Sequence, residues 1–264
     1  MSRFETKFAE LAAKKEGAFV PFVTLCDPTF DRSFEIICTL VENGADALEL
    51  GFPFSDPLLD GPVIQAANNR ALNAGHSTED SFKLLAKVRS TYPKIPISLL
   101  LCANLIFAKG LDNFYQRCAE VGVDGLIIPD LPKEEQFELV EALDNTENAP
   151  ILIQLVAPVS ADRIPMILEN ARGYVYCVSS MGVTGQAAHF HKNVRKYLEN
   201  VKAVSKIPVM MGFGIRTAED VAGLKDTIDG CIVGTHFIEL MEENNYDLDV
   251  AKEYIRTFKR ELNA

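Results

Sequence analysis

The sequence is short of basic residues. Of its 264 residues, 26 are lysine or arginine and 37 are aspartate or glutamate, which gives a formal net charge of −11 at pH 7. A chain with this charge repels the phosphate backbone of DNA or RNA, and no run of lysines and arginines interrupts the acidic background. We therefore expect no nucleic-acid partner.

The sequence also lacks a segment long enough to cross a membrane. The longest apolar run, "ISLLLCANLIFA" (97–108), is interrupted by Ser98 and Asn104 and is shorter than the ~20 residues that a membrane-spanning helix needs. The N-terminal stretch "MSRFETKFAELAAKK" carries charges at the spacing of an amphipathic helix, unlike a signal peptide. The six cysteines form no C-x-x-C motif, which is typical of reduced thiols. We predict a cytoplasmic protein without a membrane partner.

Several common binding motifs are missing. The sequence contains neither G-x-x-x-x-G-K-[ST] nor G-x-G-x-x-G, and no predicted strand ends in a lysine that could form a Schiff base. His189 and His191 lie close together, but a solvated loop is favoured over a metal site because no cysteine or carboxylate accompanies them. We expect no metal and no cofactor in this chain.

Eight short apolar runs alternate with segments of helical spacing. The runs are almost continuously apolar, which is typical of parallel strands covered on both faces. Between them, "DRSFEIICTLVENG" (31–44) and "TAEDVAGLKDTI" (217–228) have the period of amphipathic helices. The predicted strands are 18–25, 45–50, 96–101, 125–130, 150–156, 174–179, 208–213 and 229–234.

The spacing of these runs predicts the fold. They begin about every 22 to 33 residues, with one wider gap of about 51 residues after the second run. Eight such units predict an α/β protein with a (β/α)8 TIM barrel, formed by one domain over residues 1–264; a doubly wound open sheet is the alternative. The wide gap predicts an inserted helix at "VIQAANNRALNAG" (63–75), and the N-terminal pattern predicts an extra helix before the first strand.

Glu49 is the candidate catalytic residue. In the predicted strand it shares a face with Gly51, whereas Leu48 and Leu50 point the other way. If the leucines pack against outer helices, Glu49 points into the barrel near the carboxyl end of its strand, where barrel enzymes carry their chemistry. Burial without a partner raises the pKa of a carboxyl group and makes it a proton donor near neutral pH. The other interpretation is a structural glutamate paired with a lysine or arginine.

Asp60 is a second candidate. It lies near the end of "GFPFSDPLLDGP" (51–62), an apolar segment stiffened by prolines that is suited to the wall of a pocket. An aspartate before glycine is also a common turn signal, so a catalytic role and a turn are equally favoured.

Three glycine-containing motifs follow the last three predicted strands: "GVTG" (182–185), "GFGI" (212–215) and "VGT" (233–235). Glycine lets the backbone approach a ligand closely, and N–H groups at the start of a helix bind anions. Barrels commonly bind phosphate after strands seven and eight, so we predict a phosphate site, although each motif alone is compatible with a tight turn. The long polar segment 179–193 predicts a mobile lid.

Taken together, these motifs resemble the tryptophan synthase α subunit family. The segments "GAFVPFVTLCDP", "GADALELGFPFSDPLLDGPVIQ" and "GVDGLIIPDLP", followed by the three glycine motifs, occur in the family's order and spacing. The most specific of them is "ELGFPFSDPLLDGP". The resemblance implies a barrel lyase of tryptophan biosynthesis, which cleaves indole-3-glycerol phosphate to indole and glyceraldehyde 3-phosphate by general acid–base catalysis.

The resemblance also implies roles for individual residues. Glu49 would be the acid–base residue, Asp60 its partner at the indole nitrogen, and Tyr176 would lie near Glu49, although an aromatic ring that only fills the barrel is an equal alternative. The implied substrate-binding residues are Phe22, Leu100 and Phe213 around the indole ring, Gly185, Gly214, Gly234 and Thr235 at the phosphate, and Thr184 on the lid.

Some positions depart from the family pattern. Cys102 stands where a tyrosine is expected, Ser180 where an arginine is frequent, Thr235 where serine is usual, and His236 where alanine is usual. The change at position 236 suggests an additional cation near the phosphate.

The family works as an α2β2 complex with a β subunit that carries pyridoxal phosphate, and the resemblance implies the same partner at the loop 53–62. Two other functions remain open: another phosphate-binding barrel enzyme of amino-acid biosynthesis, and a non-catalytic subunit that activates a partner enzyme.

Overall fold

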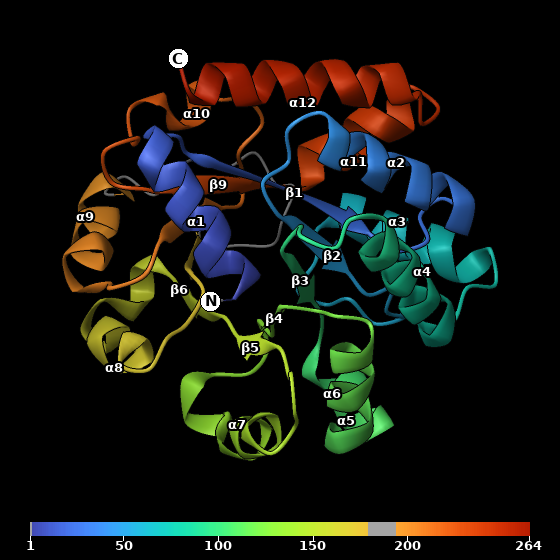
Figure 1. Ribbon diagram of the computed structural model, residues 1–264, viewed down its shortest axis with the longest axis horizontal. Coiled ribbons are helices and arrows are strands. Elements are labelled where there is room, and N and C mark those ends of the chain that lie inside the picture. The colour runs from blue at the N-terminus through green and yellow to red at the C-terminus, as the bar shows by residue number, and fades with distance from the viewer. Residues whose placement is uncertain (1, 179–193) are drawn as a thin grey trace.

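A computed structural model describes residues 2–178 and 194–264, and it shows parallel strands surrounded by helices (Figure 1). The nine strands of these residues form one sheet in the order β5-β4-β3-β2-β1-β9-β8-β7-β6. The two strands at the ends of this order, β5 and β6, are consecutive in the chain and separated only by Ile153, so the sheet closes into a barrel. The strands are β1 (Ala18–Thr24), β2 (Leu48–Gly51), β3 (Ile97–Leu100), β4 (Gly125–Ile127), β5 (Ile151–Leu152), β6 (Gln154–Val156), β7 (Val175–Val178), β8 (Val209–Gly212) and β9 (Gly230–Val233).

The predicted (β/α)8 barrel is confirmed, with one difference in strand number. The predicted fifth strand, 150–156, is two strands because its first half pairs with β4, where Ile151 lies opposite Gly125, and its second half pairs with β7, where Gln154 lies opposite Val175. The doubly wound alternative is wrong, because the two ends of such a sheet would not meet.

Both additional helices are present. They are α1 (Arg3–Lys14) before the first strand and α3 (Pro62–Asn73) after β2. The helix predicted at 217–228 is wrong in length, because only α10 (Glu219–Ala222) forms and the chain turns at Gly223. The other helices are α2 (Phe30–Glu42), α4 (Thr78–Thr91), α5 (Ala103–Lys109), α6 (Leu111–Glu120), α7 (Phe137–Asp144), α8 (Ile164–Leu168), α9 (Val194–Val204), α11 (Thr235–Glu243) and α12 (Leu248–Leu262), with short 3-10 helices at Lys133–Glu135 and Pro158–Arg163. None of the helices in the described ranges has the length and apolarity needed to cross a membrane.

Helix α1 covers the amino end of the barrel, where it lies across the strands in Figure 1. The helix begins with a capping box, in which Ser2 and Glu5 satisfy each other's backbone N–H groups. Its Phe4 and Phe8 rings contact the buried Tyr174 ring, with centroids 5.4 and 6.1 Å away. A ligand therefore reaches the barrel interior from the carboxyl ends of the strands.

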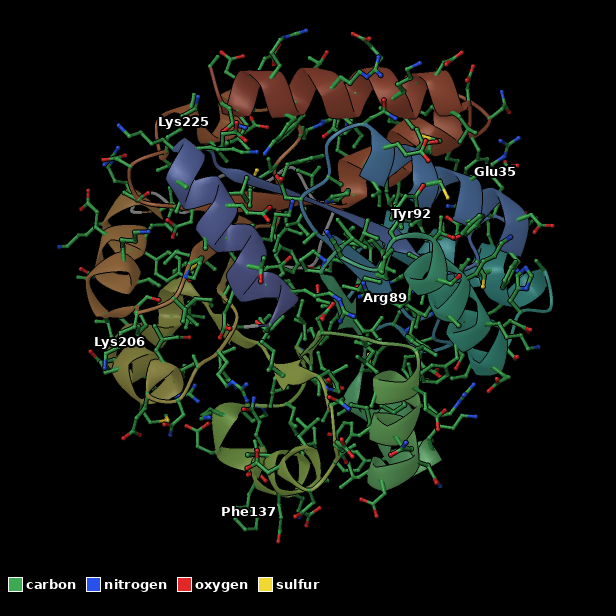
Figure 2. The ribbon with its side chains drawn as sticks, in the orientation of Figure 1. Glu35, Arg89, Tyr92, Phe137, Lys206 and Lys225 are labelled. Carbon is green, nitrogen blue, oxygen red and sulfur yellow. The ribbon has the colours of Figure 1, made fainter. Side chains whose placement is uncertain are left out.

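Ion pairs and hydrogen bonds also join the amino ends of the strands. Asp124, which precedes β4, accepts hydrogen bonds from Arg3 and Arg89, both at 2.8 Å, and from the backbone N–H of Ile97 at 2.9 Å. Arg89 points from α4 toward the barrel (Figure 2). This network joins α1, α4, β3 and β4 at the end of the barrel that is remote from the predicted active site.

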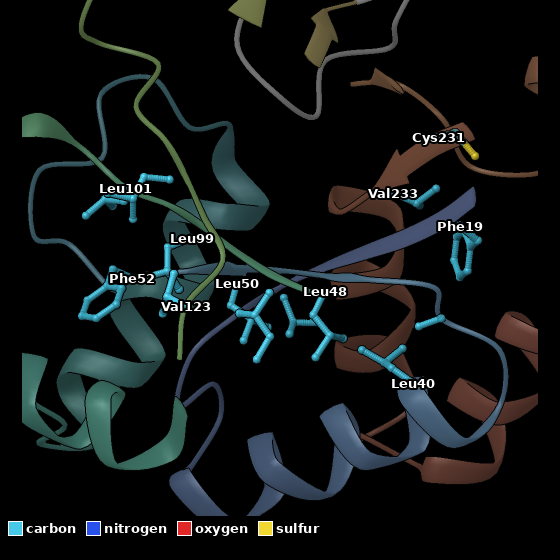
Figure 3. Close-up of a cluster of buried hydrophobic side chains, with 14 of the residues drawn as sticks. Phe19, Leu40, Leu48, Leu50, Phe52, Leu99, Leu101, Val123, Cys231 and Val233 are labelled. Carbon is cyan, nitrogen blue, oxygen red and sulfur yellow. The ribbon is translucent and has the colours of Figure 1, made fainter. Parts of the chain in front are cut away.

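The core has an outer layer between strands and helices and an inner layer inside the barrel. Leu48 and Leu50 point from β2 toward Leu40 of α2 and belong to the outer layer (Figure 3). Phe22 and Tyr176 belong to the inner layer. The alternation along β2 thus turns the leucines outward and leaves the intervening position for the interior.

We expect Leu48→Ala to lower the free energy of unfolding by about 2–5 kcal/mol, because it removes a fully buried side chain and leaves a cavity. Leu58→Ala is the matched control. The Leu58 side chain is 83% exposed, so its removal should change stability by less than about 0.5 kcal/mol. Urea unfolding of both variants measures the difference, and equal effects would contradict the two-layer core.

Candidate functional site

Glu49 is a buried carboxyl group inside the barrel. It lies on β2 beside Phe22 of β1 and Ser98 of β3 in the strand register, and it is 1% exposed. Its Oε2 atom has no hydrogen-bond partner, and no lysine or arginine of the described ranges forms an ion pair with it. Burial raises the pKa of Glu49 to about 8. At neutral pH the group is therefore mostly protonated and able to donate its proton.

Two tyrosines of the β7 segment face Glu49. Burial, and in second place the Glu49 carboxyl group, raise the pKa of Tyr174 and of Tyr176 well above the ordinary value. Tyr174 forms a hydrogen bond with Ser98 (3.3 Å between the hydroxyl oxygens), whereas the Tyr176 ring contacts Phe213 edge-on at 5.8 Å. The two phenols are therefore neutral groups beside the buried acid, and Tyr176 lies on the side that leads to the loop after β8.

Asp60 is held by α3, the inserted helix. The Nδ2 atom of Asn68 donates to Asp60 Oδ2 at 3.3 Å, and Nε2 of Gln65 donates to the Asp60 carbonyl oxygen at 2.7 Å. Burial raises the pKa of Asp60 to about 6, and the hydrogen bond from Asn68 partly offsets this rise. Asp60 also belongs to a turn, since its N–H donates to the Pro57 carbonyl at 3.0 Å. At pH 7 its carboxyl group is largely ionised.

Asp60 and Asn68 contribute polar side chains to a cavity that is lined mostly by apolar residues. The space among these side chains is about 30 Å³, enough for a water-sized group. Burial raises the pKa of the Cys102 thiol in this wall to about 11, and the thiol is therefore neutral. The cavity is lined by Phe22, Gly51, Phe52, Phe54, Leu59, Asp60, Ile64, Asn68, Leu100, Leu101, Cys102 and Pro129.

The loop after β8 has an unusual backbone. Phe213 and Gly214 have φ angles of +70° and +73°, in the left-handed region. This conformation suits glycine but is strained for phenylalanine, and such strain is characteristic of functional sites. The loop therefore presents both a ring and a section of exposed backbone at the carboxyl end of the barrel.

The start of α11 can bind an anion. The helix begins at Thr235 after Gly234, and no side chain from the described part of the chain caps it, so its first N–H groups are available. A Cβ atom on Gly234 would lie 2.8 Å from the Phe22 ring, and one on Gly51 would lie 2.7 Å from it. Phe22 therefore separates the apolar cavity from the start of α11, and both glycines leave room for its ring.

His236 does not supply the cation suggested by the sequence. Burial, and then the nearby Arg216, lower the pKa of His236 below its ordinary value. Arg216 Nε donates to His236 Nδ1 at 3.4 Å, which fixes the neutral ring. The cation beside the start of α11 is thus Arg216, which the sequence did not suggest.

Other predicted residues lie outside the described residues. They are Thr184, Gly185, Ser180 and the histidine pair at 189 and 191, all within 179–193. Within residues 2–178 and 194–264, no group of three or more histidine, cysteine, aspartate or glutamate side chains could hold a metal ion.

Sequence reasoning missed Asn68 and Gln65. The available signal was two amide residues spaced three apart on the predicted helix. The structure adds that Asn68 is buried, at 3% exposure. Their hydrogen bonds to Asp60 could not be predicted without knowing how the loop folds back onto α3.

Comparisons with known proteins agree on one family. The family model "Tryptophan synthase alpha chain" matches residues 8–264. A tryptophan synthase alpha chain from Haemophilus influenzae is 58% identical over 267 residues and covers 98% of both chains, and one from Lachnospira eligens is 53% identical over 264 residues and covers 100% of both.

Solved structures give the same result. A structure from Aquifex aeolicus covers 100% of both chains with a TM-score of 0.90 at 33% identity. A structure of Mycobacterium tuberculosis tryptophan synthase covers 100% of this chain and 99% of its own, with a TM-score of 0.89 at 30% identity. Sequence and fold therefore agree over the whole length, and the chain belongs to the tryptophan synthase alpha chain family.

Proposed function

We propose that Glu49 is the proton shuttle of this chain's reaction, the cleavage of indole-3-glycerol phosphate to indole and glyceraldehyde 3-phosphate in tryptophan biosynthesis. The observation that carries this assignment is a fully buried carboxyl group without a hydrogen-bond partner on Oε2, whose pKa is raised to about 8. The chain is a lyase, and the alpha chain carries no cofactor of its own, since pyridoxal phosphate belongs to the beta subunit.

The bond cleavage needs two proton transfers. Protonation of the indole ring at C3 turns the ring into an electron sink, and removal of a proton from the side-chain hydroxyl group lets the carbon–carbon bond break to give the aldehyde. A protonated Glu49 can give the first proton and, once ionised, take the second, so the carboxyl group ends in its starting state. A pKa near 8 makes the protonated form the resting form at pH 7.

Asp60 supplies a negative charge that stabilises the positive charge of the protonated indole. Positive charge develops on the indole nitrogen when C3 is protonated, and an ionised carboxylate near the N1–H group stabilises it. Asp60 lines the apolar cavity together with Phe22 and Leu100, which we assign to the faces of the indole ring. Its raised pKa of about 6 still leaves it mostly ionised at pH 7.

We assign the remaining roles by resemblance to the family. Tyr176 acts beside Glu49 in the reaction, and its ring contacts Phe213, which we assign to the indole ring. The backbone at Gly214 and Gly234, with the Thr235 hydroxyl group, would bind the phosphate at the start of α11. Thr184 and Gly185, from the segment 179–193, would complete the site.

We further propose that the chain binds a tryptophan synthase beta subunit in an α2β2 complex. Leu58 and Leu59, on the loop before α3, are 83% and 47% exposed at the mouth of the barrel. Phe137 is 75% exposed and points away from α7 in Figure 2. Exposed apolar side chains of this size are typical of a surface that a partner covers. A cytoplasmic location stays a prediction.

A buried acid without a hydrogen-bond partner on Oε2 supports a catalytic chain over a subunit that only activates a partner. The first test is therefore chemical. We expect Glu49→Gln to reduce kcat for indole release at least ~100-fold, because the amide cannot donate or accept the proton.

Glu35→Gln is the control for this variant. Glu35 is exposed at the edge of α2 (Figure 2), and its replacement should leave indole release unchanged. A fluorometric assay of indole formation measures both variants. If Glu49→Gln kept wild-type activity, the non-catalytic alternative would be favoured.

The free energy of unfolding of Glu49→Gln, measured against pH, tests the raised pKa of Glu49. The folded-state pKa of Glu49, about 8, lies above its ordinary value of 4.5, so the unfolded state ionises first as the pH rises. Wild type should therefore lose stability relative to Glu49→Gln between about pH 4.5 and 8, with no further relative loss above pH 8. Urea unfolding at a series of pH values measures this, and parallel curves would show that Glu49 is not buried as an unpaired acid.

The pH dependence of kcat/KM should report both acids. Activity should fall below about pH 6, where Asp60 becomes protonated, and above about pH 8, where Glu49 loses its proton. Asn68→Ala should move the acidic limb to higher pH, because the Asn68 hydrogen bond lowers the pKa of Asp60. Asn69→Ala, on the exposed side of the same helix, should leave both limbs in place. An unshifted limb in Asn68→Ala would assign it to another group.

A further inference from the structure

Arg70, near the end of α3, holds three segments together. Its Nε and Nη2 atoms donate to both carboxylate oxygens of Asp27 at 2.8 and 2.9 Å, and its Nη1 atom forms an ion pair with Glu242 at 3.0 Å. Asp27 lies in the loop after β1, and Glu242 lies near the end of α11. The guanidinium group also stands over the Tyr246 ring, 5.9 Å from its centroid.

Each of these segments carries a different part of the proposed site. Helix α3 holds Asp60 through Asn68, strand β1 carries Phe22, and α11 begins at Thr235. Helices α3 and α11 pack against each other along the outside of β1 (Figure 1). Arg70 therefore joins the helix of the ring subsite to the helix of the phosphate subsite, at the ends of both helices that are remote from the substrate.

The contact between Arg70 and Asp27 is shielded from solvent and has a fixed orientation. The Asp27 side chain is 6% exposed and the Arg70 side chain 23%, so the pair is shielded from solvent. A two-point contact between a guanidinium group and a carboxylate fixes orientation as well as distance, and only arginine can make it. Buried ion pairs of this kind contribute little net stability, because desolvation opposes the attraction. Their more useful effect is to specify one arrangement of the elements that they join.

We propose that Arg70 is a positioning residue that sets the distance between the ring subsite and the phosphate subsite. This inference rests on the proposed function, because it takes the cavity at Asp60 and the start of α11 as the two ends of one substrate site. A substrate that bridges both subsites is sensitive to their separation, whereas a fragment that occupies one subsite is not. Misplacement by about 1 Å can reduce a rate ~100-fold without a change in any group that touches the substrate.

The test compares the whole substrate with its two halves. We expect Arg70→Lys, which keeps the charge but loses the two-point contact, to lower kcat/KM for indole-3-glycerol phosphate at least ~10-fold. The dissociation constants of indole and of glyceraldehyde 3-phosphate, each measured alone, should stay within about twofold of wild type. The chain contains no tryptophan, so the fluorescence of bound indole is read without background from that residue, and calorimetry measures the aldehyde phosphate.

Two further variants separate the link to α11 from general effects. Glu242→Gln removes only the ion pair between Arg70 and α11. It should also lower kcat/KM, and the dissociation constants of indole and of glyceraldehyde 3-phosphate should stay unchanged. Arg117→Lys alters exposed ion pairs to Glu79 of α4 and to Glu120 of its own helix, α6. It should change neither kcat/KM nor the dissociation constants of the two fragments. Circular dichroism at the assay temperature confirms that each variant is folded.

The outcomes are distinct. If Arg70→Lys weakens the binding of both fragments as much as it lowers kcat/KM, its role is structural and the proposal is overturned. The proposal is also overturned if kcat/KM is unchanged in Arg70→Lys, or if Glu242→Gln leaves it unchanged while Arg70→Lys lowers it. Failure of the proposed function itself gives another result, because wild type would then release no indole.

Discussion

An unpaired carboxyl group inside the barrel is the feature on which the rest of this site depends. Placing Glu49 there costs free energy, because its ionised form loses its hydration and gains no partner. The fold tolerates the group because its neutral form is stable in the interior and because Leu48 and Leu50, on either side of it, are fully buried in the outer core. The same burial that makes Glu49 unfavourable for stability gives it a proton to donate at pH 7.

The two ends of the barrel serve different needs. At the amino end, Asp124 is satisfied by two arginines and a backbone N–H, and α1 covers the strands. At the carboxyl end, Glu49 lacks a partner, Phe213 has a strained backbone, and no described side chain caps the start of α11. The stabilising contacts of Asp124 and α1 therefore lie at the end where no ligand enters. The polar groups and backbone N–H groups that a substrate could satisfy lie at the carboxyl end.

The sequence predicted what depends on local periodicity and order along the chain. The period of two along β2 turned Glu49 inward, and the spacing of apolar runs predicted the barrel and the inserted helix α3. What it could not predict depends on partners distant in sequence. Burial, and then Arg216, which lies 20 residues earlier, lower the pKa of His236. The predicted fifth strand divides at Ile153 because its halves have different partners. The ties of Arg70 to Asp27 and Glu242 likewise required the folded chain.

The two acids differ in pKa because their surroundings differ. Both are raised by burial, but Glu49 lies inside the barrel without a donor, whereas Asp60 lies at its mouth and accepts a hydrogen bond from Asn68. Between pH 6 and 8 the deeper acid is therefore protonated while the outer one is ionised. This starting state fits the proposed roles, in which Glu49 offers a proton at C3 of the indole and Asp60 a negative charge at its nitrogen. Exchanging the two environments would place the charge where the proton is needed.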